Sequence, residues 1–301
     1  MYGGIELGGT NCNFAVGASA NEIVATARFD TGSDAAATLH HAVEWFQDQE
    51  RRLGQNLTAL GVASFGPLDL VRGTITRTPK AGWDMTPLRQ ELGRALGCPV
   101  AVNTDVNCAA LAEHAFGAGV GSRVFLYLTV GTGIGAGVVV SGELVHGKGH
   151  PEMGHMRIPQ RRDDSFVGSC LFHGSCWEGL ASGQALATRY RMRPADIVDL
   201  RAWELEADYL ALGVTNLICS FRPHRIALGG GVFNHDGLLE SVVERVSGLL
   251  TTAYFAEAQE VAEILVTPDL GSSSGVVGAL LIAQELTSAP TMPVSRGDSA
   301  D

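Results

Sequence analysis

The first half of the chain opens with three short runs in which apolar positions alternate with small or polar ones, a pattern that predicts antiparallel strands joined by tight turns. The runs cover residues 2–7, 12–17 and 23–29. A helix is predicted over residues 34–53, with Asp34 as its N-cap and Gly54 as its stop. The remaining elements predicted in this half are strands at residues 59–64 and 99–103 and a helix at 105–116.

The second half repeats this arrangement from residue 124 onwards. Its predicted strands lie at residues 124–130, 137–140, 143–146, 225–228 and 263–267, and its predicted helices at 183–191, 202–221, 237–250 and 274–285. Both halves begin with a hairpin whose turn contains glycine and threonine, GGT at residues 8–10 and GTG at 131–133. A duplicated unit of this kind predicts an α/β fold with two lobes around a cleft.

The duplication also sets the expected domain boundaries. We expect a small α/β lobe over residues 1–115, completed by the C-terminal helix at about 274–287, and a large α/β lobe over residues 116–273. Residues 288–301 are small, polar and proline-containing, so we expect them to form a disordered tail.

Composition and net charge indicate which kinds of molecule the protein can bind. With 301 residues and 46% hydrophobic content, the chain is a globular protein large enough for two lobes. A net charge of -11 repels nucleic-acid phosphates and anionic lipid surfaces, so we expect a small molecule as partner, and neither nucleic acid nor membrane. The first residues lack a signal-peptide pattern, and no run reaches the roughly 18 apolar residues of a membrane span, which predicts a cytoplasmic protein. Six scattered cysteines argue against a disulfide framework.

Three glycine-rich turns are suited to phosphate, because backbone N–H groups converge there and no Cβ intrudes. The first, Gly8-Gly9-Thr10, is by itself better explained by a tight hairpin alone. In the second, residues 129–137, alternate glycines leave one strand face bare, which implies close approach of a ligand or of another backbone. The third, residues 227–233, lies between a strand and a helix, where a nucleotide can rest against the backbone.

Residues 150–179 concentrate histidine and cysteine, and four of them have the spacing of metal ligands. These four are His155, Cys170, His173 and Cys176. Thiolate and imidazole are the ligands that a tetrahedral zinc ion prefers, so we predict a structural zinc site, with His146 and His150 as alternative ligands. Residues 156–169 carry few apolar side chains, and we expect the zinc ion to hold this stretch in place.

Three carboxylates are candidates for the chemistry of the site. Asp105 stands where a strand passes into a helix, at the mouth of the expected cleft. If the site binds a sugar, Asp105 can take a proton from a hydroxyl as its oxygen attacks a phosphate; otherwise it simply caps the helix. Glu152 and Glu178 flank the histidine and cysteine segment, so a zinc knuckle would hold both toward a sugar. The alternative for both glutamates is a solvated surface position.

Eight segments together carry a resemblance to a known family: GIELGGTN (4–11), SFGPLD (64–69), TPKAGW (78–83), NTDVNCAALAE (103–113), LTVGTGIGAG (128–137), HPEMGH (150–155), CLFHGSCWEGLASG (170–183) and ALGGGVF (227–233). On these segments the chain resembles the ROK group of sugar kinases, and within it the zinc-containing fructokinases, from residue 3 to about residue 283. The resemblance implies a two-lobe hexokinase/actin-like (ribonuclease H-like) fold with an interlobe active-site cleft and a zinc-bound insertion. It also implies ATP and Mg²⁺, transfer to the 6-hydroxyl of a hexose, and a homodimer.

The resemblance also implies roles for individual residues. Asp105 would be the catalytic base. The sugar contacts would be Glu152, His155 and Glu178. The zinc ligands would be His155, Cys170, His173 and Cys176. The phosphate contacts would be Gly8, Gly9, Thr10, Thr132 and Gly133, and the nucleoside contacts Gly230 and Gly231.

Among the sugars, three features shared with the fructokinases favour fructose: Thr104 before the aspartate, which we expect at the substrate, His173 in the CxxHxxC knuckle, and Glu6. We therefore expect an ATP-dependent kinase that converts D-fructose to D-fructose 6-phosphate. The alternatives are a glucokinase or mannokinase of the same family and a non-catalytic sugar-binding protein. Asn11 replaces the lysine usual after GGT, so one contribution to neutralising phosphate charge is expected to be missing.

Some members of this group are sugar-responsive transcription repressors, which we do not expect here. Such a repressor needs an N-terminal winged helix, whereas the first glycine turn already begins at residue 8, and the net charge of -11 also opposes DNA binding.

Overall fold

Two five-stranded sheets form the framework of the computed structural model, which describes residues 1–250 and 258–288. The strands of the first sheet are β1 (Tyr2–Leu7), β2 (Asn11–Ser19), β3 (Glu22–Asp30), β4 (Ala59–Ser64) and β7 (Val100–Thr104). Those of the second are β8 (Val124–Val130), β9 (Ile134–Val140), β10 (Glu143–Leu144), β11 (Arg225–Gly229) and β12 (Leu265–Val266). A separate hairpin joins β5 (Leu68–Asp69) to β6 (Thr74–Ile75).

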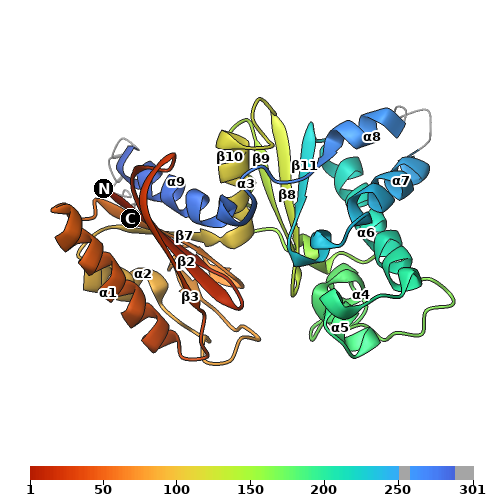
Figure 1. Ribbon diagram of the computed structural model, residues 1–301, viewed down its shortest axis with the longest axis horizontal. Helices are drawn as coiled ribbons and strands as arrows, with labels where there is room; N and C mark the ends of the chain where they lie inside the picture. The colour runs from red at the N-terminus through yellow and green to blue at the C-terminus, as the bar shows by residue number, and fades with distance from the viewer. Residues whose placement is uncertain (251–257, 289–301) are drawn as a thin grey trace, which may run out of the picture.

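The two sheets have the same topology (Figure 1). Their strand orders are β3-β2-β1-β4-β7 and β10-β9-β8-β11-β12. In each sheet three strands pair antiparallel as a meander, and the next two join in parallel. The predicted duplication and the two-lobe α/β fold are therefore confirmed.

Helices cover the faces of both sheets (Figure 1). Those around the first sheet are α1 (Ala35–Leu53), α2 (Leu88–Leu96) and α9 (Ser274–Ser288), with α9 on the face opposite α1 and α2. Those around the second are α4 (Trp177–Ala181), α5 (Gly183–Tyr190), α6 (Leu200–Phe221), α7 (Leu238–Leu250) and α8 (Ala258–Ile264). Four 3₁₀ turns complete the described elements: η1 (Met153–His155), η2 (Pro194–Asp196), η3 (Gly231–Asn234) and η4 (Gly271–Ser273). No helix in the described ranges combines the length and apolar character that crossing a membrane requires.

Helix α3 (Asp105–Phe116) lies between the two sheets, and its sequence explains why. Every residue from Asn107 to Glu113 is buried, and a helix that is apolar on all sides requires packing partners on all sides. Glycines on both sides allow the approach, since a Cβ at Gly137 of β9 or at Gly278 of α9 would meet the backbone of α3. The start of α3 is therefore fixed relative to both lobes.

Most of the predicted elements are confirmed, and the differences have local causes. Asp34 caps α1 through a hydrogen bond from the Ala37 N–H, and Gly54 ends it in a left-handed conformation. The predicted strand at 263–267 is wrong at its start, because Glu263 and Ile264 end α8. The sequence pattern missed α2, α4, α8 and the β5–β6 hairpin, all of which are short.

The packing of α3 and α9 bears on only one part of the predicted domain division. Helix α9 packs against β1 and β4, whereas α3 packs against α9 as well as β8 and β9. The boundary at residues 115 and 116 stays a prediction. Ser288 ends α9, and the rest of the tail that we expected to be disordered, residues 289–301, lies outside the described residues.

Glu113 fastens α3 to the loop that leads into α9. Its carboxylate is fully buried and accepts hydrogen bonds from four donors, at 2.6–3.0 Å. The donors are the backbone N–H groups of Ala118, Asp269 and Leu270 and the Ser274 hydroxyl. One side chain thus satisfies buried groups from two segments far apart in the chain.

We predict that Glu113→Ala lowers the free energy of unfolding by about 3–5 kcal/mol, because it leaves buried donors without an acceptor. Urea denaturation followed by circular dichroism measures the change. Glu91→Ala, which removes an exposed carboxylate from α2, is the matched control and should change stability by no more than about 0.5 kcal/mol. Equal stability of the two variants would contradict the role given to Glu113.

Candidate functional site

A cavity of about 600 Å³ opens between the lobes. The first sheet contributes Glu6 and Arg28, and α3 contributes Asp105. The second lobe contributes residues 229–231 at the end of β11, and the loop before α9 contributes residues 267, 268, 271 and 272. A ligand in this cavity would therefore contact both lobes at once.

Asp105 is the first residue of α3 and faces this cavity. The N-cap is Thr104, whose hydroxyl accepts a hydrogen bond from the Asn107 N–H at 3.2 Å, so the capping role considered for Asp105 is wrong. Burial raises the pKa of the Asp105 carboxyl to about 7; a hydrogen bond from the Val106 N–H opposes the rise, while the charges of Glu6 and Glu152 add to it. The carboxyl group can therefore gain and lose a proton near neutral pH.

Thr104 itself is buried, and its hydroxyl is used in the cap. It does not belong to the residues that line the cavity. Its expected contact with the substrate stays a prediction. In the structure, the role of Thr104 is to cap the start of α3.

Glu6 brings a second carboxylate into the cavity, on β1 of the first sheet. Burial raises its pKa, while a hydrogen bond from the Asn13 side-chain amide at 2.8 Å and the positive charge of Arg28 lower it. Gly275 lies so close to Glu6 that a Cβ at that position would overlap its carboxylate. Two carboxylates, Glu6 and Asp105, thus face one cavity.

The first glycine turn (residues 8–10) joins β1 to β2, and the second (residues 131–133) joins β8 to β9. Each is closed by a backbone hydrogen bond of 2.9 Å, from the Gly8 N–H to the Asn11 carbonyl and from the Gly131 N–H to the Gly133 carbonyl. Space for a Cβ is open at Gly9 and Gly131. Thr132 is exposed at the tip of the second turn.

The bare strand face of residues 129–137 is explained by another backbone. Gly137 packs against the backbone of α3, and Gly135 against the Val106 side chain. Gly230 has φ of +93° and lies against the backbone of Val130, so only glycine fits there. Together with Gly231 it lines the cavity, as expected for the third glycine-rich turn.

The structure brings the four predicted metal ligands together. Their ligand atoms all lie within 4.8 Å of one another, and three sulfur-to-nitrogen distances are 3.6, 3.7 and 3.8 Å. A tetrahedral zinc ion with bonds of about 2.3 Å to sulfur and about 2.05 Å to nitrogen separates such atoms by about 3.6 Å. Both cysteines are free thiols. The donor set and its spacing therefore fit tetrahedral zinc.

The alternative ligands considered for this site are wrong. His150 donates to or accepts from Glu152, with 2.8 Å between Nε2 and Oε1, and His146 is absent from the cluster that the described residues form. Glu152 itself is half exposed, yet close enough to Asp105 to raise its pKa.

Glu178 links the metal cluster to the second glycine turn. Its Oε2 accepts a hydrogen bond from the Ile134 N–H at 3.0 Å, and its Oε1 lies 4.0 Å from His155 Nδ1. The side chain is largely buried, so the solvated surface position considered for Glu178 is wrong. Because Glu178 follows Cys176 by two residues, the cluster and the turn are mechanically connected.

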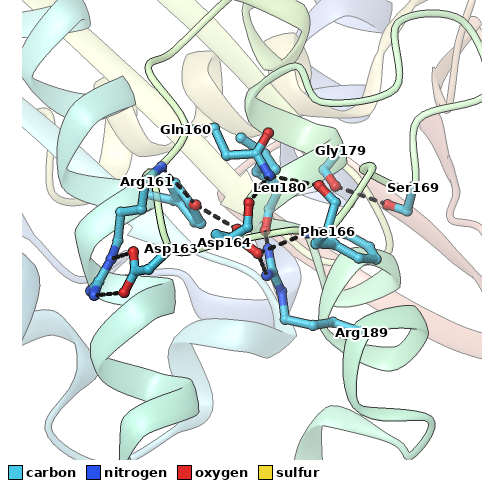
Figure 2. A network of polar contacts seen from close by, with 10 residues as sticks. Gln160, Arg161, Asp163, Asp164, Phe166, Ser169, Gly179, Leu180 and Arg189 are labelled. Atoms are coloured by element: carbon cyan, nitrogen blue, oxygen red, sulfur yellow. Dashed lines mark hydrogen bonds and ion pairs between the residues drawn. The ribbon is translucent and has the colours of Figure 1, made fainter.

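A second anchor holds the segment that we expected zinc alone to fix (Figure 2). Asp164 forms a buried ion pair with Arg189 and accepts hydrogen bonds from the Tyr209 hydroxyl and the Phe166 N–H. Burial alone would raise the pKa of Asp164, but the hydrogen bonds from Arg189 and Tyr209 hold it below its ordinary value. Arg161 adds ion pairs with Asp163 and Asp208 on the exposed side. Polar side chains therefore fix this stretch despite its few apolar residues.

Sequence reasoning missed two cations near the site. Arg28 lines the cavity from β3, and Lys80 donates hydrogen bonds to the Gly9 carbonyl at 2.7 Å and the Thr31 carbonyl at 3.1 Å. The signal for Lys80 was the segment TPKAGW, which was noted only as a matching segment. Arg28 is one of several polar residues of β3, with Glu22, Thr26 and Asp30, so the sequence did not single it out.

Comparison with known proteins agrees with this geometry. Residues 2–286 match the model of the ROK family. A fructokinase from Zymomonas mobilis is 41% identical over 94% of this chain and 96% of its own length. A ROK hexokinase from Thermus thermophilus superposes with a TM-score of 0.79 at 30% identity, covering 95% of this chain and 98% of its own.

A ROK family glucokinase from Streptomyces griseus, solved with glucose and AMPPNP, gives a TM-score of 0.77 at 25% identity, over 94% of this chain and 99% of its own. Two lobes of the same topology, a carboxylate at the start of the helix between them and a match over nearly the whole length lead to one conclusion: the chain belongs to the ROK family.

Proposed function

We propose that this protein is an ATP-dependent hexose kinase that converts D-fructose to D-fructose 6-phosphate. The observation that carries the proposal is Asp105, a carboxyl group with a pKa of about 7 at the start of a helix fixed between two lobes. A general base works best when its pKa lies near the working pH. The identity to a fructokinase over nearly the whole chain supports fructose as the sugar.

In the proposed reaction the 6-hydroxyl oxygen of the sugar attacks the γ-phosphorus of ATP. The hydroxyl proton passes to the Asp105 carboxylate as the new O–P bond forms. The bond between the γ-phosphorus and the bridging oxygen breaks, and its electron pair leaves with ADP. Glu152, His155 and Glu178 would bind the sugar hydroxyls, since they come from the same segment and two of them are linked to the second glycine turn or the metal cluster.

The three glycine turns would hold the nucleotide. Gly8, Gly9, Thr10, Thr132 and Gly133 would contact the phosphates, and Gly230 and Gly231 the nucleoside, because both glycines of the third turn line the cavity. Mg²⁺ prefers carboxylate and phosphate oxygens, so Glu6, which lines the cavity, fits the ion and would hold it together with the nucleotide, while Asp105 would stay free to accept the proton. When bound, the ion neutralises charge on the phosphates.

Zinc and a homodimer complete the proposal. The four-ligand cluster would hold zinc as a structural ion, which would fix Glu178 beside the second glycine turn.

The closest alternative function is a glucokinase or mannokinase of the same family, because these hexoses differ by one stereocentre or by the position of the carbonyl. A non-catalytic sugar-binding protein is the other alternative.

The first test is ADP production by the purified protein with ATP and Mg²⁺, comparing fructose, glucose and mannose at equal concentrations. We expect the highest kcat/KM with fructose. A preference for glucose or mannose would replace the proposed substrate and leave the kinase assignment standing. Sugar binding without ADP formation would favour the non-catalytic alternative.

Asp105→Asn tests the base. We expect kcat to fall by about 10²–10⁴-fold with sugar affinity retained, and the wild-type kcat/KM to rise with pH through about 7 as the carboxyl group ionises. Asp236→Asn, an exposed aspartate outside the cavity, is the matched control. Unchanged turnover in Asp105→Asn would remove Asp105 as the base.

Asp105→Asn should also change the stability of the folded protein, by an amount that depends on pH. Because the folded pKa lies above the ordinary value of 3.8, ionised Asp105 opposes folding, fully above pH 7 and less as the pH falls toward 4. Asp105→Asn should therefore be more stable than wild type at pH 8, by at most about 4 kcal/mol, with a smaller difference at pH 5. Thermal melting at both pH values measures the effect.

Cys170→Ser tests the metal cluster. We expect the variant to lose zinc, measured by mass spectrometry of the metal content, and to lose hydrogen-exchange protection around residues 170–176. Protection near Asp164 should be largely retained, because the ion pair with Arg189 is independent of the metal. Cys219→Ser, an exposed thiol outside the cluster, is the control. A wild-type protein that is active and fully protected without metal would defeat the zinc proposal.

A further inference from the structure

The surroundings of the proposed phosphate site are strongly acidic. Glu6 and Asp105 line the cavity, and Glu152 acts on the Asp105 carboxyl through its charge. Glu178 accepts a hydrogen bond from the Ile134 N–H, directly after the second glycine turn. Among the described residues that line the cavity, Arg28 is the only cation. A nucleotide triphosphate carries several negative charges, so it needs further positive charge where its phosphates lie.

Lys80 places a positive charge on the first glycine turn. Its ammonium group donates to the carbonyl of Gly9 at 2.7 Å, and to the carbonyl of Thr31, at the end of β3, at 3.1 Å. Thr31 in turn donates its backbone N–H to the Thr10 carbonyl of the same turn. An ammonium group has three protons, and these two acceptors leave one proton for a further partner.

The segment around Lys80 is built to hold this position. The Trp83 indole is fully buried and donates to the Gly32 carbonyl at 2.9 Å, directly after Thr31. The Thr78 hydroxyl donates to the Gly66 carbonyl at 3.3 Å, and Gly82 lies against the backbone of Ser33, where a Cβ would overlap it. The segment thus attaches to the chain just after β3 and just after β4, and Lys80 lies between the residues that make these attachments.

The residue that follows the turn is neutral. Asn11 begins β2 directly after Thr10, and it carries no charge toward the turn. Lys80 is far from the turn in sequence but contacts it in the fold, so the positive charge at this turn comes from a different segment.

We propose that Lys80 is the phosphate-positioning cation of this site, and that its ammonium group binds the terminal phosphates of the nucleotide at the first glycine turn. The proposal rests on the proposed kinase function for the identity of the ligand. Lys80 fixes the turn through Gly9 and offers its remaining proton and its charge to a phosphate oxygen. It is a positioning residue, and its contribution increases with the number of phosphates on the ligand.

The test compares the affinities of adenosine, AMP, ADP and ATP by isothermal titration calorimetry, for wild type and Lys80→Met. We expect ATP affinity to fall by about 10–100-fold in the variant, ADP affinity by less, and adenosine and AMP affinity by less than about twofold. In steady-state kinetics KM for ATP should rise while KM for the sugar stays constant. A merely structural lysine would weaken all four ligands equally.

Three further variants that change Lys80 separate charge from structure, and a fourth variant is the control. Lys80→Gln keeps a donor for the Gly9 carbonyl without the charge, and it should reproduce the loss of ATP affinity even if Lys80→Met proves unstable. Lys80→Arg keeps the charge and should retain most of the affinity. Asn11→Lys combined with Lys80→Gln restores a cation beside the turn and should recover part of the ATP affinity. Arg77→Gln removes an exposed cation three residues earlier and should change nothing.

The outcomes distinguish this proposal from the proposed function. Equal ATP affinity in wild type and Lys80→Gln, with sugar phosphate still formed, would overturn the role of Lys80 and leave the kinase standing. A phosphate-dependent loss of affinity in a protein that forms no sugar phosphate would support Lys80 and contradict the kinase. A wild-type protein without affinity for any of the four ligands would overturn both.

Discussion

The contact of helix α3 with both sheets is the constraint on which the rest of the site depends. Gly137 on one side and Gly278 on the other let the backbones of β9 and α9 reach the backbone of α3. Glu113 adds a buried carboxylate that ties the far end of the helix to the loop before α9. With α3 held along its length, the position of Asp105 at its first turn follows from packing rather than from any contact of its own side chain. The packing that fixes the helix also shields much of the Asp105 carboxyl from water, and this burial raises its pKa into the neutral range.

Charge is the second organising feature of the site. Carboxylates gather around a cavity whose proposed ligand is itself a polyanion, and the charges of Glu6 and Glu152 both raise the pKa of Asp105. Such an arrangement suits proton abstraction, since it keeps a carboxyl group ready to accept a proton, but it opposes phosphate binding. Cations from separate segments, Arg28 on β3 and Lys80 after β6, offset this opposition. Glu178 hydrogen-bonds the Ile134 N–H directly after the second glycine turn, so in the proposed function the metal cluster would affect the nucleotide only through this contact.

The sequence predicted those features that depend on interactions between residues close together in the chain. The caps of α1, Asp34 and Gly54, were predictable because a side-chain acceptor and a left-handed glycine act within one turn of the helix. The metal cluster was predictable because its donors have a characteristic spacing. Helix α2 was missed because Pro87 stands at its N-cap and offers no side-chain hydrogen bond. The bare face of β9 left two explanations open, and only the fold shows that α3 occupies it. Lys80 and Arg28 reach the site through tertiary contacts that no sequence spacing encodes.

In the proposed reaction the γ-phosphoryl group of ATP moves to a sugar hydroxyl at the Asp105 site, and not to water. The most direct measurement is ³¹P nuclear magnetic resonance of the products formed by wild-type protein from ATP and fructose. We expect a phosphomonoester resonance coupled to the two protons on C6 of the sugar, in equal amount to ADP. Formation of ADP with inorganic phosphate and no sugar ester would contradict it, because the acceptor would then be water.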